Sequence, residues 1–449
     1  MFRFVALKQI RVGLYKPKAI ISASNQSENR VVSSGCKIIP IPENLGGNEL
    51  FKLFYFNNQW VTEDYVRKNF RDTVASVNFI APLRDCSGYA EAGRNYLAAL
   101  DKVGIQVRGE SVSFEPARAE CGVAEEALSA CINKDISYST NIVFLTPDHF
   151  PIYKRPGSYN IGIFDWETDV LPAEWVPCCN TMDEIWVPCQ WTASVCKSSG
   201  VVKPINVFGH CAPLEDFENV EEFRIPGVKD SWYKFYSVFQ WTERKNPVGL
   251  IEAYLKAFSS SDPVVLILKT YRCNYSDSEK KAVFQEIEKI KRSVKRKKLP
   301  RIVLVLDLLT RKQLLGLHKY ADCFALIHRA EGWGLPHFEA CMLGKPVITT
   351  GQSGNMEFTT EENSYLVDGP MIQVEGMPWI PWYRSHMKWW DPSTEQCKNY
   401  FRLVFNNRED AIKRAKLAQE LVRKKFCLEA VGNAMKARIL EVSGRGLEL

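Results

Sequence analysis

The sequence contains no apolar run of the roughly 18–20 residues that a membrane-spanning helix needs. Its 14 cysteines include no Cys-x-x-Cys pair, and the adjacent Cys178 and Cys179 have no second pair at the spacing of zinc ligands. No segment repeats at a fixed period, which argues against a solenoid or a propeller. These absences predict a soluble protein that keeps its thiols free in a reducing compartment.

The amino-terminal residues lack the continuous apolar core of a signal peptide, although they carry no acidic residue before Glu28. A transit peptide is one interpretation of this basic start. An ordinary first strand or a loose terminus is the interpretation that we favour, and we expect a cytoplasmic protein. Residues 1–70 show no readable periodicity and are treated as an N-terminal extension of unclear structure.

The formal net charge of +6 depends on one short stretch, residues 289–301, which holds eight basic residues and no acidic one. Without this stretch the chain has 50 basic against 52 acidic residues and is close to neutral. The simplest interpretation is a solvated helix face, and the alternative is a patch attracted to anionic membrane lipid. Because no aromatic residues are interleaved with these charges, the stretch does not predict nucleic-acid binding.

From residue 75 onward, short runs rich in valine and isoleucine alternate with loops and helical stretches. This alternation predicts parallel strands connected by helices, the α/β class. It covers residues 71–215, is interrupted by a linker at 216–232, and restarts over 233–400. Two such halves would form a cleft between the carboxyl ends of their strands, and helices over 401–449 are expected to return to the first half. The expected strands are 75–81, 141–145, 160–164, 183–187, 205–208, 235–241, 264–268, 302–306, 323–327 and 347–349, and the expected helices are 89–100, 192–198, 247–258, 277–298, 311–319 and 336–343.

The most informative segment is EGWGLPHFE, which follows a predicted strand and runs into a predicted helix. Gly332 and Gly334 allow the backbone to approach a ligand closely. The helix that begins near Leu335 or Pro336 would present its amino terminus, which favours an anion.

Two glutamates flank this loop. Glu339 lies in the first turn of the predicted helix, where it could accept hydrogen bonds from vicinal hydroxyl groups such as those of a ribose. The alternative is that Glu331 and Glu339 are solvated residues, one of which only complements the helix dipole. Composition alone does not separate these interpretations.

The longer segment EGWGLPHFEACMLGKPVITT resembles the signature of the retaining glycosyltransferases of family 4. That signature has two glutamates separated by seven residues in a Gly-rich loop, followed by a small-residue helix and Gly-x-Pro-Val. The resemblance implies the GT-B architecture, in which two Rossmann-like domains face each other across a cleft. It also implies that Glu331 and the loop hold the donor sugar and its phosphates, and that Glu339 binds the ribose. The loop residues to which the resemblance extends are Gly332, Trp333, Gly334 and Leu335.

A second segment, FQWTERKNP, ends the first strand of the second half, where family members place an Arg/Lys pair on the diphosphate. Arg244 and Lys245 match that pair, and Lys269 is a further candidate. A departing diphosphate needs such cations because negative charge develops on it in the transition state. The alternative is that Arg244 and Lys245 are surface charges. The Gly-Arg spacing that is usual in the family is replaced here by Thr-Glu-Arg-Lys-Asn-Pro, so which basic residue has which role stays open.

The first half offers weaker candidates. In DCSGYAEAGR, the loop after the first strand, the resemblance places Gly88 at the donor phosphates. DWETDVLPAEW also resembles relatives of this type, which implies that Glu167 and Asp169 face the acceptor; a structural role is the alternative. Some family members place a histidine near the donor sugar, and His149 after a predicted strand is a candidate, with loop packing as the alternative.

Together these features predict a retaining glycosyltransferase that moves a hexose from a GDP or UDP sugar to a hydroxyl of a glycan, lipid or small molecule. The chain contains no Asp-x-Asp, so we expect no obligatory metal and no cofactor besides the nucleotide sugar. The rival interpretations are a GT-B phosphorylase or nucleotide-sugar epimerase, and a catalytically silent nucleotide-sugar or glycan-binding protein on the same fold. The tryptophans of residues 371–392 fit either stacking on a sugar or docking against the first half.

Overall fold

The computed structural model describes residues 75–114 and 124–443, together with short strands nearer the amino terminus. These strands form a three-stranded antiparallel sheet in the order β1-β4-β5 and a separate pair, β2 and β3. They fall in the segment 1–70, whose structure was unclear from the sequence. Their bounds are β1 (Arg3–Phe4), β2 (Arg30–Val32), β3 (Ile38–Pro40), β4 (Leu53–Phe56) and β5 (Gln59–Thr62).

The first half is a parallel six-stranded sheet in the order β11-β10-β9-β8-β6-β7. The central strands β8, β9 and β10 are buried along their whole length, as expected where helices cover both faces of a sheet. The strands are β6 (Ser76–Ala81), β7 (Gln106–Ser111), β8 (Thr140–Phe144), β9 (Tyr159–Ile163), β10 (Glu184–Val187) and β11 (Ile205–Val207), and the helices are α2 (Gly88–Lys102), α3 (Ala124–Cys131), α4 (Phe150–Tyr153), α5 (Trp175–Thr181) and α6 (Gln190–Ser199).

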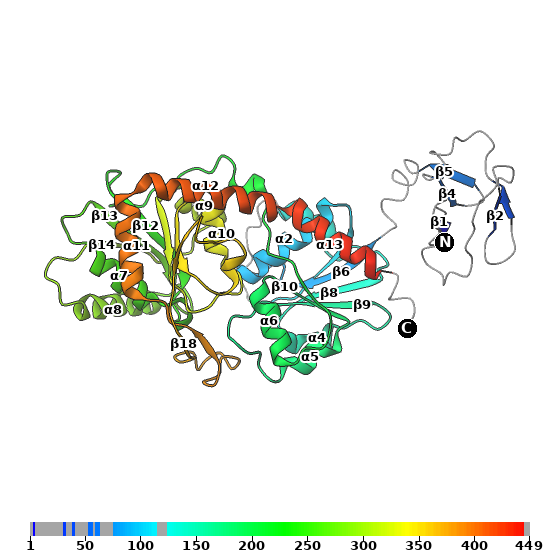
Figure 1. Cartoon of the computed structure of the whole chain (residues 1–449), viewed down its shortest axis with the longest axis horizontal. Helices are drawn as coiled ribbons and strands as arrows, with labels where there is room; N and C mark the ends of the chain where they lie inside the picture. The colour runs from blue at the N-terminus through cyan, green and yellow to red at the C-terminus, as the bar shows by residue number, and fades with distance from the viewer. Residues whose placement is uncertain are drawn as a thin grey trace.

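The second half is another parallel six-stranded sheet, in the order β14-β13-β12-β15-β16-β17. This is the strand order of a dinucleotide-binding Rossmann sheet, whose switch point lies between β12 and β15. The two sheets lie side by side in Figure 1 and confirm the predicted α/β class with two Rossmann-like halves. The strands are β12 (Tyr233–Gln240), β13 (Val264–Tyr271), β14 (Arg301–Val305), β15 (Cys323–Leu326), β16 (Val347–Thr350) and β17 (Tyr365–Val367), and the helices are α7 (Pro247–Ala257), α8 (Asp277–Ser293), α9 (Arg311–Tyr320) and α10 (Leu335–Met342).

The predicted helix over 277–298 ends five residues earlier than expected, at Ser293. Lys295 has a positive φ of 50°, which turns the chain out of the helix. Arg296 then donates hydrogen bonds to the backbone carbonyls of Leu255 and Phe258 at 2.9 and 3.0 Å, and so closes the end of α7. At least one charge of the basic stretch is thus structural, and attraction to anionic lipid stays a prediction.

The carboxyl-terminal helices connect the halves as predicted. In Figure 1, α12 runs along the second half and α13 continues over the first, where it packs on α2. Arg438 of α13 lies 2.5 Å from the fully buried carboxylate of Glu184 in β10. Gly432 of α13 lies against the backbone of α2: a Cβ at this position would stand 2.3 Å from the carbonyl oxygen of Ala99. These helices are α11 (Thr394–Asn406), α12 (Arg408–Lys425) and α13 (Leu428–Val442).

Replacing Gly432 by leucine should detach α13 from α2, because the added side chain has no space against the Ala99 carbonyl. We expect a loss of about 1–3 kcal/mol in unfolding free energy, seen as a lower melting temperature. Asn433→Leu, on the exposed side of the same helix, is the matched control and should melt like the wild type. Equal melting temperatures for the two variants would show that the close approach is not required.

A second connection between the halves is the strap, residues 371–390, which contains the hairpin of β18 (Met371–Gln373) and β19 (Lys388–Trp390). It leaves the second sheet and contacts the first half (Figure 1). The Tyr383 hydroxyl donates to Glu167 at 2.7 Å, and the backbone N–H of Lys388 donates to Asp169 at 2.7 Å. The tryptophan-rich segment therefore docks on the first half, as one of the two sequence interpretations proposed.

Candidate active site

A cavity of about 600 Å³ lies between the two sheets, where the loops after their central strands meet. From the first half it is lined by the loop after β6, by Thr146 after β8 and by residues 165–167 after β9. From the second half it is lined by the segments that follow β12 and β15. This is the cleft predicted at the carboxyl ends of the strands, and it includes the switch point of the second sheet.

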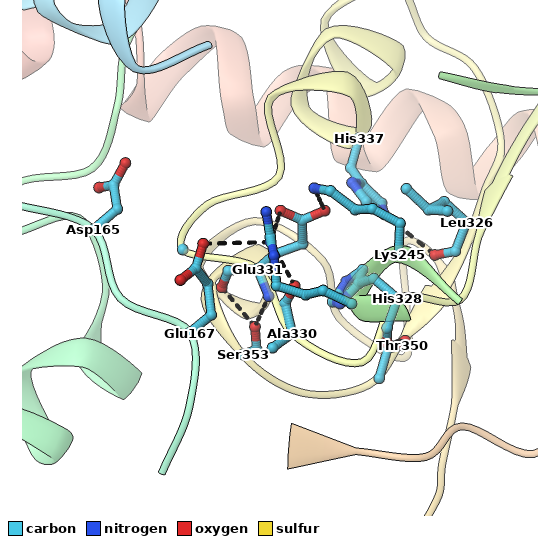
Figure 2. A network of polar contacts seen from close by, with 12 residues as sticks. Asp165, Glu167, Lys245, Leu326, His328, Ala330, Glu331, His337, Thr350 and Ser353 are labelled. Carbon is cyan, nitrogen blue, oxygen red and sulfur yellow. Dashed lines mark hydrogen bonds and ion pairs between the residues drawn. The ribbon is translucent and has the colours of Figure 1, made fainter. Parts of the chain in front are cut away.

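Glu331 lines this cavity and is held by two cations from the turn after β12, of which Figure 2 labels Lys245. Arg244 Nη1 lies 3.2 Å from Glu331 Oε2 and also donates to the carbonyl of Ala330 at 2.9 Å. Lys245 Nζ bonds the other carboxylate oxygen, Oε1. Asn246, with a positive φ of 50°, ends this turn and caps α7, which fixes where Arg244 and Lys245 project.

The charge state of this cluster follows from its burial. Burial alone would raise the pKa of Glu331, but Lys245 and Arg244 outweigh it and hold that pKa well below its usual range. Beneath the glutamate, burial lowers the pKa of His328 well below its usual value and that of His337 to about 4. Glu331 is thus an anion and both histidines are neutral at pH 7.

Glycine is required at positions in the loop and against it. A Cβ at Gly354 would stand 1.9 Å from the carbonyl oxygen of Gly332, and Gly334 has a positive φ of 90°. Ser353 accepts from the Glu331 N–H at 2.7 Å and donates to its carbonyl at 2.6 Å, which holds the loop in place. Helix α10 begins directly after Gly334, and its first residues line the cavity, so its amino terminus faces the space.

Glu339 lines an adjoining cavity of about 400 Å³ that shares Gly88 and Leu335 with the first. Its carboxylate bonds Arg311 of α9, and His318 Nε2 lies 3.3 Å from Oε2. Burial would raise the pKa of Glu339, but Arg311 and His318 lower it to about 2. A carboxylate offers about four lone-pair directions, so Glu339 keeps acceptor capacity for a ligand.

Glu167 reaches the cluster from the first half. Its Oε1 lies 3.4 Å from Arg244 Nη1, and its Oε2 accepts from Tyr383 of the strap. One guanidinium therefore touches carboxylates from both halves, as the dashed lines of Figure 2 show for Glu331 and Glu167.

The other predicted residues divide into two groups. Those that line the main cavity are Gly88, Lys269, Gly332, Trp333, Gly334 and Leu335. His149 and Asp169 lie outside its lining. His149 Nδ1 bonds Thr146 Oγ1 at 3.0 Å, and its ring packs on Phe114, so its contacts are those of the loop-packing alternative. Asp169 binds the backbone of the strap, which is likewise a structural role.

Sequence reasoning missed a buried pair on the first half. His210 Nε2 lies 3.1 Å from Asp165 Oδ2, and His210 Nδ1 lies 2.9 Å from the Tyr96 hydroxyl. Asp165 and His210 both line the cavity, and a Cβ at Gly332 would stand 2.8 Å from Asp165 Cβ. Asp165 and His210 are 45 positions apart and share no motif, so the sequence did not connect them; the one available hint was that each follows a predicted strand.

Over the residues that the structure describes, no group of three or more His, Cys, Asp or Glu side chains could hold a metal ion. Independence from metal stays a prediction. None of the helices in the same residues is long and apolar enough to cross a membrane.

Residues 219–375 match the model of the family described as glycosyl transferases group 1. The match covers the second sheet and the Arg244, Lys245, Glu331 and Glu339 positions, and it ends inside the strap. Comparison with curated protein sequences gave no significant match.

Solved structures resemble the chain over most of its length. HepE from Anabaena, in complex with UDP and glucose, has a TM-score of 0.56 at 12% identity, over 82% of this chain and 100% of that one. Sucrose-phosphate synthase from Thermosynechococcus elongatus has a TM-score of 0.58 at 13% identity, over 82% and 99%. An E. coli trehalose-6-phosphate protein, bound with UDP-2-fluoro glucose, has a TM-score of 0.57 at 10% identity, over 82% and 99%. At such identities the likeness shows the fold, which is the GT-B arrangement of two Rossmann-like halves. Residues 219–375 are thus similar to the glycosyl transferases group 1 family, and this match within a GT-B fold indicates a glycosyltransferase.

Proposed function

We propose that the protein moves a hexose from a nucleoside diphosphate sugar of the UDP or GDP type to an acceptor hydroxyl, with retention of anomeric configuration. One observation carries this proposal: Arg244 and Lys245 converge on Glu331 beneath a glycine loop that opens the amino terminus of α10. Two cations and a helix amino terminus on one cavity wall suit a diphosphate, which leaves with negative charge.

The adjoining cavities suggest how the donor lies. The ribose would bind Glu339 in the smaller cavity, and the diphosphate would pass over Gly334 and Leu335 toward Arg244 and Lys245. The hexose would then meet Glu331 and the first half. UDP-glucose is the donor to test first, because HepE of the same fold was solved with UDP and glucose.

In the transfer, the acceptor oxygen forms a bond to the anomeric carbon while the bond from that carbon to the phosphate oxygen breaks. The electron pair leaves with the diphosphate, and the acceptor proton passes to a phosphate oxygen on the same face of the sugar. The residues of this chain bind and orient the two substrates and offset the charge of the leaving group, so no covalent enzyme intermediate is needed.

Thermal-shift binding of UDP, GDP, ADP and their sugars tests the proposal. A nucleotide present at about 100 times its dissociation constant should stabilise the protein by roughly 2.7 kcal/mol. Release of UDP or GDP from the stabilising sugar, followed by NMR of the product, then reports turnover and configuration. Binding without turnover would favour a silent binding protein. Turnover that needs inorganic phosphate and no nucleotide would favour a phosphorylase.

Lys269 should make donor binding sensitive to alkaline pH. Burial lowers the pKa of Lys269 to about 8, and its ammonium group lies on the cavity wall over Tyr275. The charged form attracts the diphosphate, so the donor dissociation constant should be constant below pH 8 and rise by up to tenfold per unit above it. Titration calorimetry from pH 6.5 to 9.5 measures this. Lys269→Arg keeps its charge over the whole range and should show a flat profile; a flat wild-type profile would contradict the assignment.

A further inference from the structure

The two walls of the main cavity differ in charge. Among the described residues, the lysines and arginines that line it are Arg244, Lys245 and Lys269, all from the second half. The first half contributes the carboxylates of Asp165 and Glu167, together with His210, which faces Asp165. Arg244 reaches this wall, 3.4 Å from Glu167, but it is already paired with Glu167 and Glu331. A phosphorylated acceptor would therefore meet carboxylates and a neutralised cation on this wall.

The same wall is aromatic. Trp382 of the strap packs on Trp175 with ring centroids 5.3 Å apart, and Tyr383 stacks on Trp166 at 5.4 Å and 17° between planes. All four residues line the cavity; Trp166 and Trp175 are only 3% and 1% exposed, so the accessible ring surface is that of Trp382 and Tyr383. Flat ring faces pack well against the apolar C–H face of a sugar. Trp382 is only half-buried, so part of it stays open to a ligand.

Four polar atoms on residues that line the cavity have no hydrogen-bond partner in the described part of the chain. Two of them lie within residues 165–175: the indole Nε1 of Trp175, a residue only 1% exposed, and Oδ1 of Asp165. Buried polar atoms of this kind call for a ligand or water partner. An indole N–H can only donate and a carboxylate can only accept, and hydroxyl groups, which do both, can serve each of these atoms.

We propose that the wall formed by Asp165, Glu167, Trp175 and the strap residue Trp382 is a binding site for a neutral, unphosphorylated sugar, which is the acceptor of the transfer. The strap thereby sets acceptor specificity, in addition to joining the halves. This inference rests on the proposed function and narrows its acceptor from glycan, lipid or small molecule to a neutral carbohydrate.

The test compares two sets of acceptors with the full-length protein and the nucleotide sugar that stabilises it, UDP-glucose or GDP-mannose. The neutral set is methyl α-glucoside, methyl α-mannoside and a mixture of maltooligosaccharides; the phosphorylated set is glucose, mannose and fructose 6-phosphates. Acceptor-dependent release of nucleoside diphosphate should be faster with the neutral set. Faster release with the phosphates, or release that neither set accelerates, would overturn the inference. If no nucleotide sugar binds or turns over at all, the proposed function itself fails.

Substitutions in the strap locate the site. Trp382→Ala should raise KM for the neutral acceptor by about tenfold or more, and Trp382→Phe should restore most of the affinity because a ring face remains. The thermal shift given by the free nucleotide should stay that of the wild type, since the cations lie on the opposite wall. Trp379→Ala is the matched control: Trp379 lies in the same strap, is 62% exposed and does not line the cavity. Equal acceptor KM values for Trp382→Ala and Trp379→Ala would overturn the site.

Discussion

Replacing Lys245 by methionine is expected to lower kcat by about 10²–10³-fold, with a much smaller change in donor affinity. Its ammonium group bonds Glu331 in the free protein, at the place where the proposed donor diphosphate would lie. Negative charge grows on that diphosphate as its bond to the sugar breaks, so a fixed cation helps the transition state more than the bound donor. Steady-state release of the nucleoside diphosphate, beside titration of donor binding, separates the two effects.

Lys245 is the better residue for this test, because Arg244 also bonds Ala330 and Glu167 and so connects the two halves. Replacing Arg244 would change the structure as well as the charge. The matched control is Lys280→Met, which removes a surface lysine paired with Asp307 at 2.6 Å, and its kcat should equal that of the wild type. Melting temperatures show whether the Lys245 variant is folded. A folded variant with kcat within threefold of the wild type would contradict a role for Lys245 in the transfer.

The second half was readable from sequence because its chemistry lies in contiguous segments. Glu331 and Glu339 occupy one loop and helix, and Arg244 and Lys245 follow a long apolar strand, so the family resemblance could be followed along the chain to all four, which line the two adjoining cavities. Arg311 escaped notice, because the first residue of a capped helix is usually a solvated charge. Only the packing of α9 against α10 turns it toward Glu339.

The strands and site residues of the first half were harder to predict from the sequence, because tertiary contacts and not local patterns bring them together. The strand β7 of this half, QVRGES, is polar and half-buried. In the second half, β17 and the strap hairpin were equally hard to predict, because their strands have only three residues and are too short to show a period. Asp165 and His210 meet through the sheet and not through any motif. His149 was chosen because it follows a strand, a position that many structural polar residues share, and Asp169 was chosen because its segment resembles that of family members.

Replacing Glu339 by alanine should weaken UDP or GDP binding by about 100-fold. A carboxylate that accepts from ribose hydroxyls makes charge-assisted hydrogen bonds, each contributing about 1.5–3 kcal/mol, and about 2.7 kcal/mol corresponds to 100-fold in affinity. The pKa of about 2 keeps Glu339 ionised at any pH from 5 to 8, so this loss should not vary with pH over that range. Titration calorimetry with UDP and GDP measures it.

The substitution also removes the main partner of Arg311, whose next carboxylate, that of Glu91, lies 3.7 Å away. Breaking a buried ion pair is costly, so Glu339→Ala should also melt at a lower temperature. Glu339→Gln separates the two effects, because the amide oxygen still accepts from Arg311 while the charge is lost, and its nucleotide affinity should fall between those of wild type and alanine. Glu409→Ala, in the first turn of α12 and exposed, is the control for removing a glutamate from a helix start. If Glu339→Gln bound nucleotide as tightly as the wild type, the ribose would have to lie elsewhere, and the donor orientation proposed across the two cavities would be wrong.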